Sequence, residues 1–345
     1  MRIALDAMGS DSAPLPEVKG ALEACAAGGV EVILVGDEAR LRSALARYGT
    51  SDRISIMHAS QAVTMDDSPV MAVRKKKDAS LLVAIRLVKQ GRADAVVSAG
   101  NTGAVMVAAR TILAPITGVA RSAICQLLPS TGSPVLLLDL GANVDCSARH
   151  LCDFAEMGVV FSRHVLGVQS PRVGLLNIGE EQVKGNELAK AVHRNLQATP
   201  HLNFIGNVEP RALYQGGADV VVCDGFVGNV VLKTSEATGG LVKALLEREY
   251  RATWISRLGA LLSLGVFKRL KQTVDPNEYA GAPLLGVNGV VIILHGSCTS
   301  RGVANAIRGA QRSAECRVND HIRVGISELR SAEVQLSGPN GRSKG

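Results

Sequence analysis

The sequence has few aromatic residues and no long apolar run, and both absences narrow what the chain can be. Phe, Trp and Tyr make up 3% of its 345 residues. Single-stranded nucleic acids commonly stack their bases on aromatic side chains, and no nucleic-acid-binding motif is present, so we expect no nucleic-acid partner. No run of 18 or more apolar residues occurs, and a membrane-spanning helix is therefore not expected.

Several signatures of metal, cofactor and export sites are also missing. The seven cysteines have no CxxC or zinc-type spacing and are expected to be reduced thiols. No His, Asp and Glu cluster has metal-ligand spacing, so no metal is expected. No cofactor is expected either. The absence of Gly-x-Gly-x-x-Gly after the first expected strand argues against a simple nicotinamide dehydrogenase, and no Gly-Lys-Ser/Thr phosphate loop is present. No basic stretch followed by an apolar run opens the chain, which favours a cytoplasmic location.

The chain is instead rich in aliphatic and small residues. Hydrophobic residues account for 47% of the chain, which suits a large buried core, and 36 glycines allow backbone to approach a ligand closely. The formal net charge is +7, which fits an anionic membrane surface or an acidic protein partner.

Short Val/Ile/Leu runs alternate with helix-length amphipathic stretches along the sequence. This alternation predicts a mostly parallel sheet covered by helices on both faces. Helices are expected, for example, at Pro16–Ala27, Glu38–Tyr48, Ser80–Gln90, Ala148–Val165 and Glu187–Asn195. The expected strands are Ile3–Leu5, Glu31–Val35, Ile54–Met57, Ala95–Ser98, Ala123–Leu128, Val135–Leu138, Arg172–Leu176, Asn203–Ile205, Val220–Val222 and Val290–Leu294.

Five of these strands end in a small polar residue followed closely by glycine. Ligands bind at the carboxyl ends of the strands in such sheets, so we expect one shared active-site rim; ordinary turn chemistry is the alternative. The five loops are Asp6–Gly9, Ser98–Gly103, Asp139–Asn143, Asn177–Glu180 and Cys223–Asn229.

Two of the loops, and one lysine, could hold a phosphate-sized anion. Ser98–Gly103 leads into an expected helix at Ala104–Leu113, where Thr102 could cap the helix or donate to a ligand. Lys184 stands beside a glycine just before another helix and could reach an anion there, or could be an ordinary solvated lysine. Asn229 is expected to open a long helix, either as its cap or as a donor to a ligand.

Other polar candidates leave alternatives open. The basic run Arg74–Lys77 is equally typical of a solvated face and of a surface that receives an acidic carrier or a phosphorylated arm. His295 follows the last expected strand and could act in acid–base chemistry, although a lone histidine is more often a structural donor. Cys146 and Cys298 have no histidine at motif spacing, so covalent catalysis by cysteine is not expected.

Seven stretches spread over nearly the whole chain resemble the bacterial phosphate acyltransferases of phospholipid synthesis. Each matches in order and together they are specific to that family. The stretches are Ile3–Gly9, Val97–Ala104, Leu138–Asp145, Leu176–Glu181 with Lys184–Glu187, Phe204–Glu209, Cys223–Asn229 and Gly281–Gly289.

The resemblance implies a Rossmann-like three-layer α/β/α sandwich with a mostly parallel sheet. A protruding helical pair is expected from the long, partly apolar stretch Val230–Tyr250 and the helical segment after it, which two copies of the chain could bury between them; packing on the chain's own sheet is the alternative. Residues 1–330 would form one acyltransferase domain, with about 230–275 as the protruding element and 331–345 as a disordered tail. The implied reaction moves a fatty acyl group from acyl-[acyl carrier protein] to inorganic phosphate and gives acyl phosphate. The implied assembly is a homodimer bound peripherally to the inner face of the cell membrane.

The resemblance makes Lys184 and Asn229 the best candidates for catalytic residues. Lys184 would carry phosphate or oxyanion charge, Asn229 would donate beside it, and Gly100–Gly103 would cradle phosphate. The full set of candidate substrate- and phosphate-binding residues is Asp6, Gly9, Ser98, Gly100, Asn101, Thr102, Gly103, Asp139, Asn143, Asn186, Asp224 and His295.

Three other functions fit parts of the pattern. One is a phosphate acyltransferase that uses acyl-coenzyme A, which a comparison of the two donors would separate. Another is a non-enzymatic lipid-sensing membrane protein, which would not need five polar loops. The third is a decarboxylating dehydrogenase of similar architecture, which would need metal-binding carboxylates and a nucleotide.

The segment 254–267 is apolar nearly all round but too short to cross a bilayer. Basic residues flank it, which is typical of a tip that lies in a membrane interface and meets anionic lipid. The alternative is a helix pair buried between two subunits. The flanking basic residues are Arg251, Arg257, Lys268, Arg269 and Lys271, and the expected membrane contacts are Leu258, Leu261, Leu262 and Val266.

Overall fold

A computed structural model describes residues 1–274, 279 and 281–336 of the chain. Within these residues, eleven strands form one sheet in the order β3-β2-β1-β4-β11-β10-β5-β6-β9-β7-β8. All ten expected strands are present. The strands are β1 (Arg2–Asp6), β2 (Glu31–Gly36), β3 (Ile54–His58), β4 (Ala95–Ser98), β5 (Ala123–Leu128), β6 (Val135–Leu138), β7 (Arg172–Leu176), β8 (Asn203–Val208), β9 (Val220–Val222), β10 (Ala282–Leu285) and β11 (Val290–Ile293).

The sheet consists of two parallel parts that run in opposite directions. β3, β2, β1, β4 and β11 are parallel to one another, as are β6, β9, β7 and β8. Three antiparallel pairings separate the parts, because β10 is antiparallel to both β11 and β5, and β5 is antiparallel to β6. Three reversals leave the second part antiparallel to the first.

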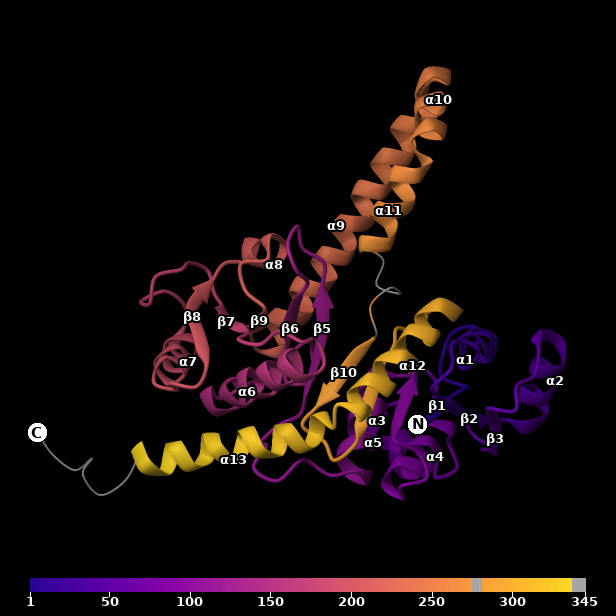
Figure 1. Ribbon diagram of the computed structural model, residues 1–345, viewed down its shortest axis with the longest axis horizontal. Helices are drawn as coiled ribbons and strands as arrows, with labels where there is room; N and C mark the ends of the chain where they lie inside the picture. The colour runs from indigo at the N-terminus through magenta and orange to yellow at the C-terminus, as the bar shows by residue number, and fades with distance from the viewer. Residues whose placement is uncertain (275–278, 280, 337–345) are drawn as a thin grey trace, which may run out of the picture.

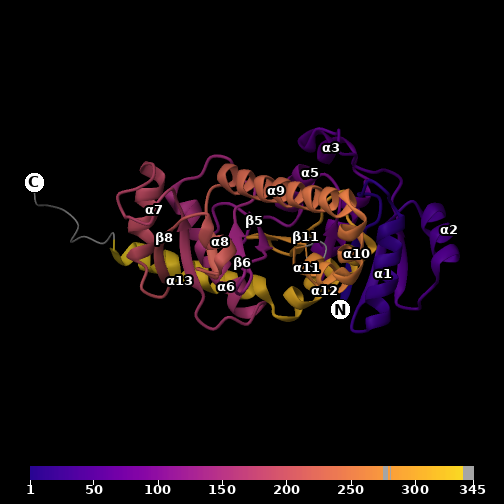
Figure 2. The same cartoon turned by 90° about the horizontal axis from the view of Figure 1, so that it is seen from above.

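Helices cover both faces of the sheet, which confirms the expected three-layer α/β/α architecture (Figure 2). One face is covered by α1 (Leu15–Ala27), α2 (Glu38–Tyr48), α6 (Ala148–His164), α7 (Glu187–Gln197), α12 (Ser300–Glu315) and α13 (Val318–Leu336). The other face is covered by α3 (Pro69–Lys75), α4 (Ser80–Lys89), α5 (Thr102–Ile112), α8 (Arg211–Gln215) and the start of α9 (Gly225–Ala252).

The core follows from the alternation of side chains along each strand. In β1, Ile3 and Leu5 pack with the helices of one face while Ala4 packs with those of the other. Buried aliphatic residues dominate both layers, since Phe154 is the only aromatic among the largest fully buried side chains of the described residues. Small residues at the packing surfaces, such as Ala104 and Ala108 of α5, let helices approach the strands closely.

The helices α9, α10 (Trp254–Leu262) and α11 (Leu264–Val274) project far from the sheet as a hairpin with α10 at its end (Figure 1). Tyr250 and Phe267 pack edge to face with ring centroids 5.1 Å apart and hold α9 against α11. Only Gly225 and Gly228, both at the base of α9, are buried among its residues. The expected protruding helical pair is therefore present.

Two details differ from the sequence-based expectations. β10 was not predicted, because its residue Pro283 cannot donate to a ladder and is unusual within a strand. Residues 331–336 were expected to be disordered but continue α13, while 337–345 lie outside the described residues. No described helix is long and apolar enough to cross a bilayer.

Candidate active site

The candidate loops form two groups rather than one rim, which corrects the expectation of a single sheet edge. β1, β4 and β11 end at one edge, while β6, β7 and β9 run the opposite way and end at the other. Consistent with this, Asn143 of the second group donates from Nδ2 to the carbonyl of Ser122, which stands just before β5. The reason is the insertion of β10 and the β5–β6 hairpin, which the alternation of hydrophobic runs did not reveal.

The first group is built around a buried carboxyl group at the end of β1. Ser98 donates from Oγ to Asp6 Oδ2 at 2.7 Å, and its Oγ accepts the backbone N–H of Gly100 at 3.1 Å. A Cβ added to Gly9 would lie 2.7 Å from Gly100 N, so only glycine allows the two loops to touch here. Burial raises the pKa of Asp6, and hydroxyl and N–H donors partly oppose that rise. The structure thus brings the candidate residues Asp6, Gly9, Ser98 and Gly100 together.

The N-terminus of α5 opens directly from this group. Asn101, not Thr102, caps the helix, because Asn101 Oδ1 accepts the Ala104 N–H at 3.0 Å. The exposed Thr102 and the half-buried Gly103 occupy its first turn, where helix N–H groups lack intrahelical partners and favour an anion. This placement supports the predicted anion site at Gly100–Gly103.

His295 follows β11 and belongs to the first group. Its Nδ1 lies 2.8 Å from Ser297 Oγ, and Asp11 donates its N–H to the Gly296 carbonyl at 2.9 Å. The imidazole is exposed, and its hydrogen-bond partners are the local ones of a turn. The contacts fit the structural reading of His295 better than an acid–base role.

The second group is organised by Asp139, which is fully buried at the end of β6. Its carboxylate accepts the N–H groups of Ile124, Ala142 and Asn143, and also Asn143 Nδ2 at 2.9 Å. Burial raises the pKa of Asp139, and these donors oppose the rise. Asp139 and Asn143 therefore shape the loop, since both Asp139 carboxylate oxygens and Asn143 Nδ2 are hydrogen-bonded within the protein.

Asn229 lies on the first turns of α9 beside this loop. The helix begins at Gly225 and is capped by Asp224, whose Oδ1 accepts the Val227 N–H at 2.9 Å, so the cap role considered for Asn229 is wrong. A Cβ on Gly228 would lie 1.8 Å from the Asp139 carbonyl oxygen, which explains how α9 approaches so closely. A Cβ on Gly141 would lie 3.7 Å from Asn229 Cγ, and the Asn229 side chain is exposed.

Lys184 lies in the loop between β7 and α7, and β7 is the neighbour of β9 in the sheet. Asn177 Nδ2 donates to the Lys184 carbonyl at 3.1 Å, and the lysine stem runs along Gly179. Asn186 caps α7 by accepting the Ala189 N–H at 2.8 Å, so its predicted substrate contact competes with a structural role. The Lys184 side chain is exposed, and among the described residues no hydrogen bond joins it to Asn229.

Exposed apolar side chains stand beside the polar residues of the second group. Val183 precedes Lys184, Val230 follows Asn229, and Val144 follows Asn143. Ile178 and Phe226, in the same loops, are also exposed. Sequence reasoning missed these residues, although their position next to each polar candidate was a readable signal.

The thiols offer little nucleophilic character. None of the seven cysteines forms a disulfide. Burial raises the pKa of Cys146 to about 11 and that of Cys298 to about 12, which leaves both protonated at neutral pH. Within the described part of the chain, no group of three His, Cys, Asp or Glu side chains is placed to hold a metal ion.

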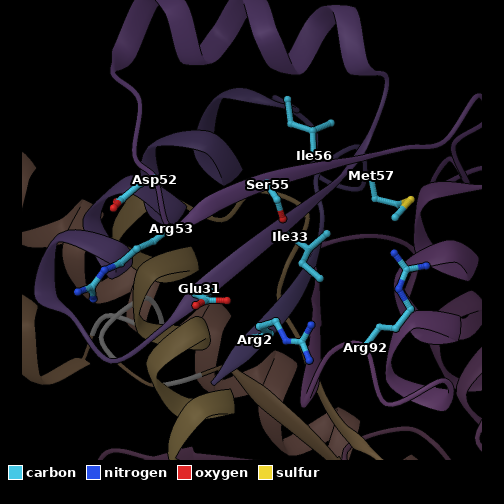
Figure 3. A pocket seen from close by; sticks show the side chains of 9 residues that line it. All are labelled: Arg2, Glu31, Ile33, Asp52, Arg53, Ser55, Ile56, Met57 and Arg92. Carbon is cyan, nitrogen blue, oxygen red and sulfur yellow. The ribbon is translucent and has the colours of Figure 1, made fainter.

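A hollow of about 370 Å³ lies away from both loop groups, at the amino ends of β1, β2 and β3. Figure 3 shows Arg2 and Arg92 on either side of Ile33, while Arg53 reaches away from them. Glu31 and Asp52 also line the hollow and offset much of the arginine charge. None of the predicted site residues lines it, so it does not belong to the candidate site.

Glu17 is a fully buried carboxyl group beneath the Gly9 loop. Its Oε1 accepts the Ser10 N–H at 3.3 Å, whereas Oε2 has no hydrogen-bond partner among the described residues. Burial raises its pKa from 4.5 to about 7, Ser10 partly opposes this, and the nearby Asp6 adds to the rise. The group therefore keeps its proton in the folded state at pH values where the unfolded chain has lost it.

Replacing Glu17 with glutamine should make the protein relatively more stable at high pH. Because the folded pKa is raised, the free energy of unfolding contributed by Glu17 falls as pH rises from 4.5 to about 7 and is level above that. Between pH 4.5 and pH 8, the free energy of unfolding of the variant should therefore rise relative to that of the parent by up to about 3 kcal/mol. Denaturant titrations at both pH values measure this, with the exposed Glu23→Gln of the same helix as control. An equal pH dependence in parent and variant would contradict the prediction.

Comparisons with known proteins agree with this architecture. Residues 1–321 match the family model described as "Fatty acid synthesis protein". The chain is 49% identical to "Phosphate acyltransferase" of Moorella thermoacetica over 335 residues, 97% of each chain, and 49% identical to the protein of that name from Trichlorobacter lovleyi, covering 95% of each.

Solved structures of lower identity share the fold. A phosphotransacetylase from Streptococcus pyogenes superposes with a TM-score of 0.62 at 18% identity, covering 91% of this chain and 94% of the other. A branched-chain phosphotransacylase from Enterococcus faecalis gives a TM-score of 0.56 at 17% identity, covering 91% and 99%.

Proposed function

Since the chain belongs to the fatty acid synthesis protein family, whose relatives are named phosphate acyltransferases, and is itself an acyltransferase, we propose that it moves a fatty acyl group from acyl-[acyl carrier protein] to inorganic phosphate. The product would be acyl phosphate for phospholipid synthesis. The observation that carries this proposal is the setting of Lys184 and Asn229 among exposed apolar side chains, since the substrate joins an anion to an aliphatic chain.

The chemistry needs positioning and charge stabilisation more than an enzyme nucleophile. A phosphate oxygen attacks the thioester carbonyl carbon, a C–O bond forms, and the carbonyl oxygen becomes an oxyanion. Collapse of this intermediate breaks the C–S bond, and the sulfur leaves on the carrier as a thiolate that takes a proton from water. Lys184 supplies positive charge to the phosphate or oxyanion, Asn229 donates an amide hydrogen bond, and the N–H groups at Gly100–Gly103 cradle phosphate.

The opposite directions of the two loop groups constrain this mechanism. In one chain, Gly100–Gly103 and Lys184 belong to opposite edges of the sheet. We therefore propose that the chain is a homodimer, in which the first loop group of one copy and the second loop group of its partner act on one phosphate. The exposed apolar residues of α9 that two copies could bury are Leu241, Val242, Leu245 and Leu246.

We propose that the hairpin end binds the inner face of the cell membrane peripherally. An acyl phosphate is apolar at one end and hydrolysable, so release at the membrane would deliver it to an acyltransferase that consumes it. The exposed apolar residues of α10 and α11 support this proposal.

A donor comparison with purified protein tests the reaction. Acyl-[acyl carrier protein] should be consumed in proportion to added phosphate, with acyl phosphate as the product, and acyl-coenzyme A should be a poor substitute because it lacks the protein surface of the carrier. Consumption measured by loss of thioester, with and without phosphate, gives the result. Equal rates with acyl-coenzyme A would favour the soluble-donor enzyme, and no phosphate-dependent loss with either donor would favour a lipid-sensing protein.

A further inference from the structure

The short helix α3 presents an apolar and basic face to solvent. Its buried residues are Ala72 and Val73, while Val70 is 61% and Met71 42% exposed. Arg74 and Lys75 stand four residues after Val70 and Met71, so the four side chains share the outward face. A helix on a soluble surface normally turns its apolar residues inward; this one buries Ala72 and Val73 but leaves Val70 and Met71 facing solvent.

Within the described residues, the charges of Arg74 and Lys75 on this face are not neutralised. Of the basic run, Lys76 is paired with Asp67 at 2.6 Å, and Lys77 donates to the Val73 carbonyl. Arg74 and Lys75 are exposed and form no ion pair among the described residues. We call the surface of Met65, Val70, Met71, Arg74 and Lys75 the α3 face.

The α3 face is fixed directly to the first loop group. Asn101, the cap of α5, donates from Nδ2 to the Met65 carbonyl at 3.1 Å and to the Asp67 carbonyl at 3.2 Å. A Cβ on Gly103 would lie 2.7 Å from Pro69 Cγ, and one on Gly296 would lie 2.6 Å from Met65 Cε. The segment 64–69 therefore bridges the loops after β4 and β11, and Figure 2 shows α3 beside α5 on the outside of the molecule.

We propose that the α3 face is the docking surface for the acidic acyl carrier protein, an inference that rests on the proposed function. Carboxylates of the carrier would pair with Arg74 and Lys75, and its apolar side chains would cover Val70 and Met71. The face adjoins the loop proposed to cradle phosphate, so the thioester arm of a carrier docked there would enter at Gly100–Gly103. Among the two interpretations of Arg74–Lys77, the structure favours the carrier surface over a merely solvated face.

Binding of fluorescently labelled holo acyl carrier protein, measured by anisotropy at low and moderate salt, tests this inference. Arg74→Glu with Lys75→Glu should weaken binding by about tenfold or more and flatten its salt dependence, because two attractive charges become repulsive. Val70→Ser with Met71→Ser should weaken binding with the salt dependence kept. The matched control is Lys89→Glu with Arg92→Glu, which makes the same charge change on exposed residues at the end of α4.

The outcomes distinguish a carrier-docking surface from a membrane contact and from a face without a binding role. The inference is overturned if the carrier affinity of the Arg74/Lys75 variant is within twofold of that of the control. It is also overturned if the α3 variants lose carrier binding only where circular dichroism shows that they have unfolded. If the variant keeps carrier binding but no longer floats with anionic vesicles, the face contacts membrane instead. If the parent does not bind the carrier at all, both this inference and the proposed donor fail, while phosphate-dependent acyl transfer from coenzyme A remains a separate measurement.

Discussion

Replacing Lys184 with alanine should lower acyl phosphate formation by about 10²–10³-fold, the usual effect of losing one preorganised donor to an oxyanion. The Lys184 side chain is exposed, and its loop is held by backbone contacts, including Asn177 Nδ2 to the Lys184 carbonyl. The substitution therefore removes the ammonium group and leaves these contacts in place. Thioester loss measures the rate, and circular dichroism checks the fold.

Lys190→Ala is the matched control for this experiment, because Lys190 lies in the next helix and pairs with Glu187 on the surface. It should retain parental turnover. Near-parental turnover of Lys184→Ala would remove Lys184 from the mechanism.

The Lys184→Ala variant also tests whether the site is shared between two copies. Gly100→Val places a side chain against Ser98 Oγ in the proposed phosphate cradle, and this variant should also be inactive. Mixing it with Lys184→Ala under conditions that exchange subunits should restore activity, because one site of each mixed dimer then has both loop groups intact. No recovery in verified mixed dimers would mean that each chain carries its own complete site.

The sequence predicts the strands and layers well because their signal is local. Val/Ile/Leu runs such as Val220–Val222 can only be stable when buried, and they alternate with amphipathic helices. The sequence did not predict the directions of the strands, because these depend on pairings between residues far apart in the chain. β10 pairs with β5, about 160 residues earlier, and contains Pro283, so no local pattern indicated it.

The candidate residues were found from their types, but their roles depend on geometry. Asn101, Asn186 and Asp224 each cap a helix, and only hydrogen-bond partners distinguish such a cap from a ligand donor. Asp139 looked like a substrate contact, yet four backbone and side-chain donors occupy its carboxylate. Lys184 and Asn229 keep exposed side chains, which is why they remain the candidates that can reach a substrate.

The end of the protruding hairpin has the composition of a surface that meets lipid. None of the residues of α10 is buried, and Leu258, Leu261 and Leu262 are 50%, 62% and 81% exposed. Val266, on α11, is 55% exposed. Exposing so many apolar side chains is unfavourable in water, since full burial of one stabilises by about 1.5–3 kcal/mol. The flanking Arg251 and Lys268 lie where they could meet anionic headgroups, each contributing about 1 kcal/mol.

Replacing Leu261 and Leu262 with aspartate should abolish flotation with vesicles of anionic lipid while activity in solution is kept. Losing two inserted leucines weakens membrane binding by at least about 3 kcal/mol, or about 100-fold, and the new carboxylates are also repelled by anionic lipid. Neither residue takes part in the Tyr250–Phe267 contact that joins α9 to α11, so the hairpin should persist. Val324→Asp, at an exposed position on α13, is the control and should float like the parent. Unchanged flotation of the Leu261/Leu262 variant would refute the membrane role. If that variant is instead monomeric or unfolded, and Leu241→Asp with Val242→Asp on α9 has the same effect, the hairpin is a buried interface between two copies.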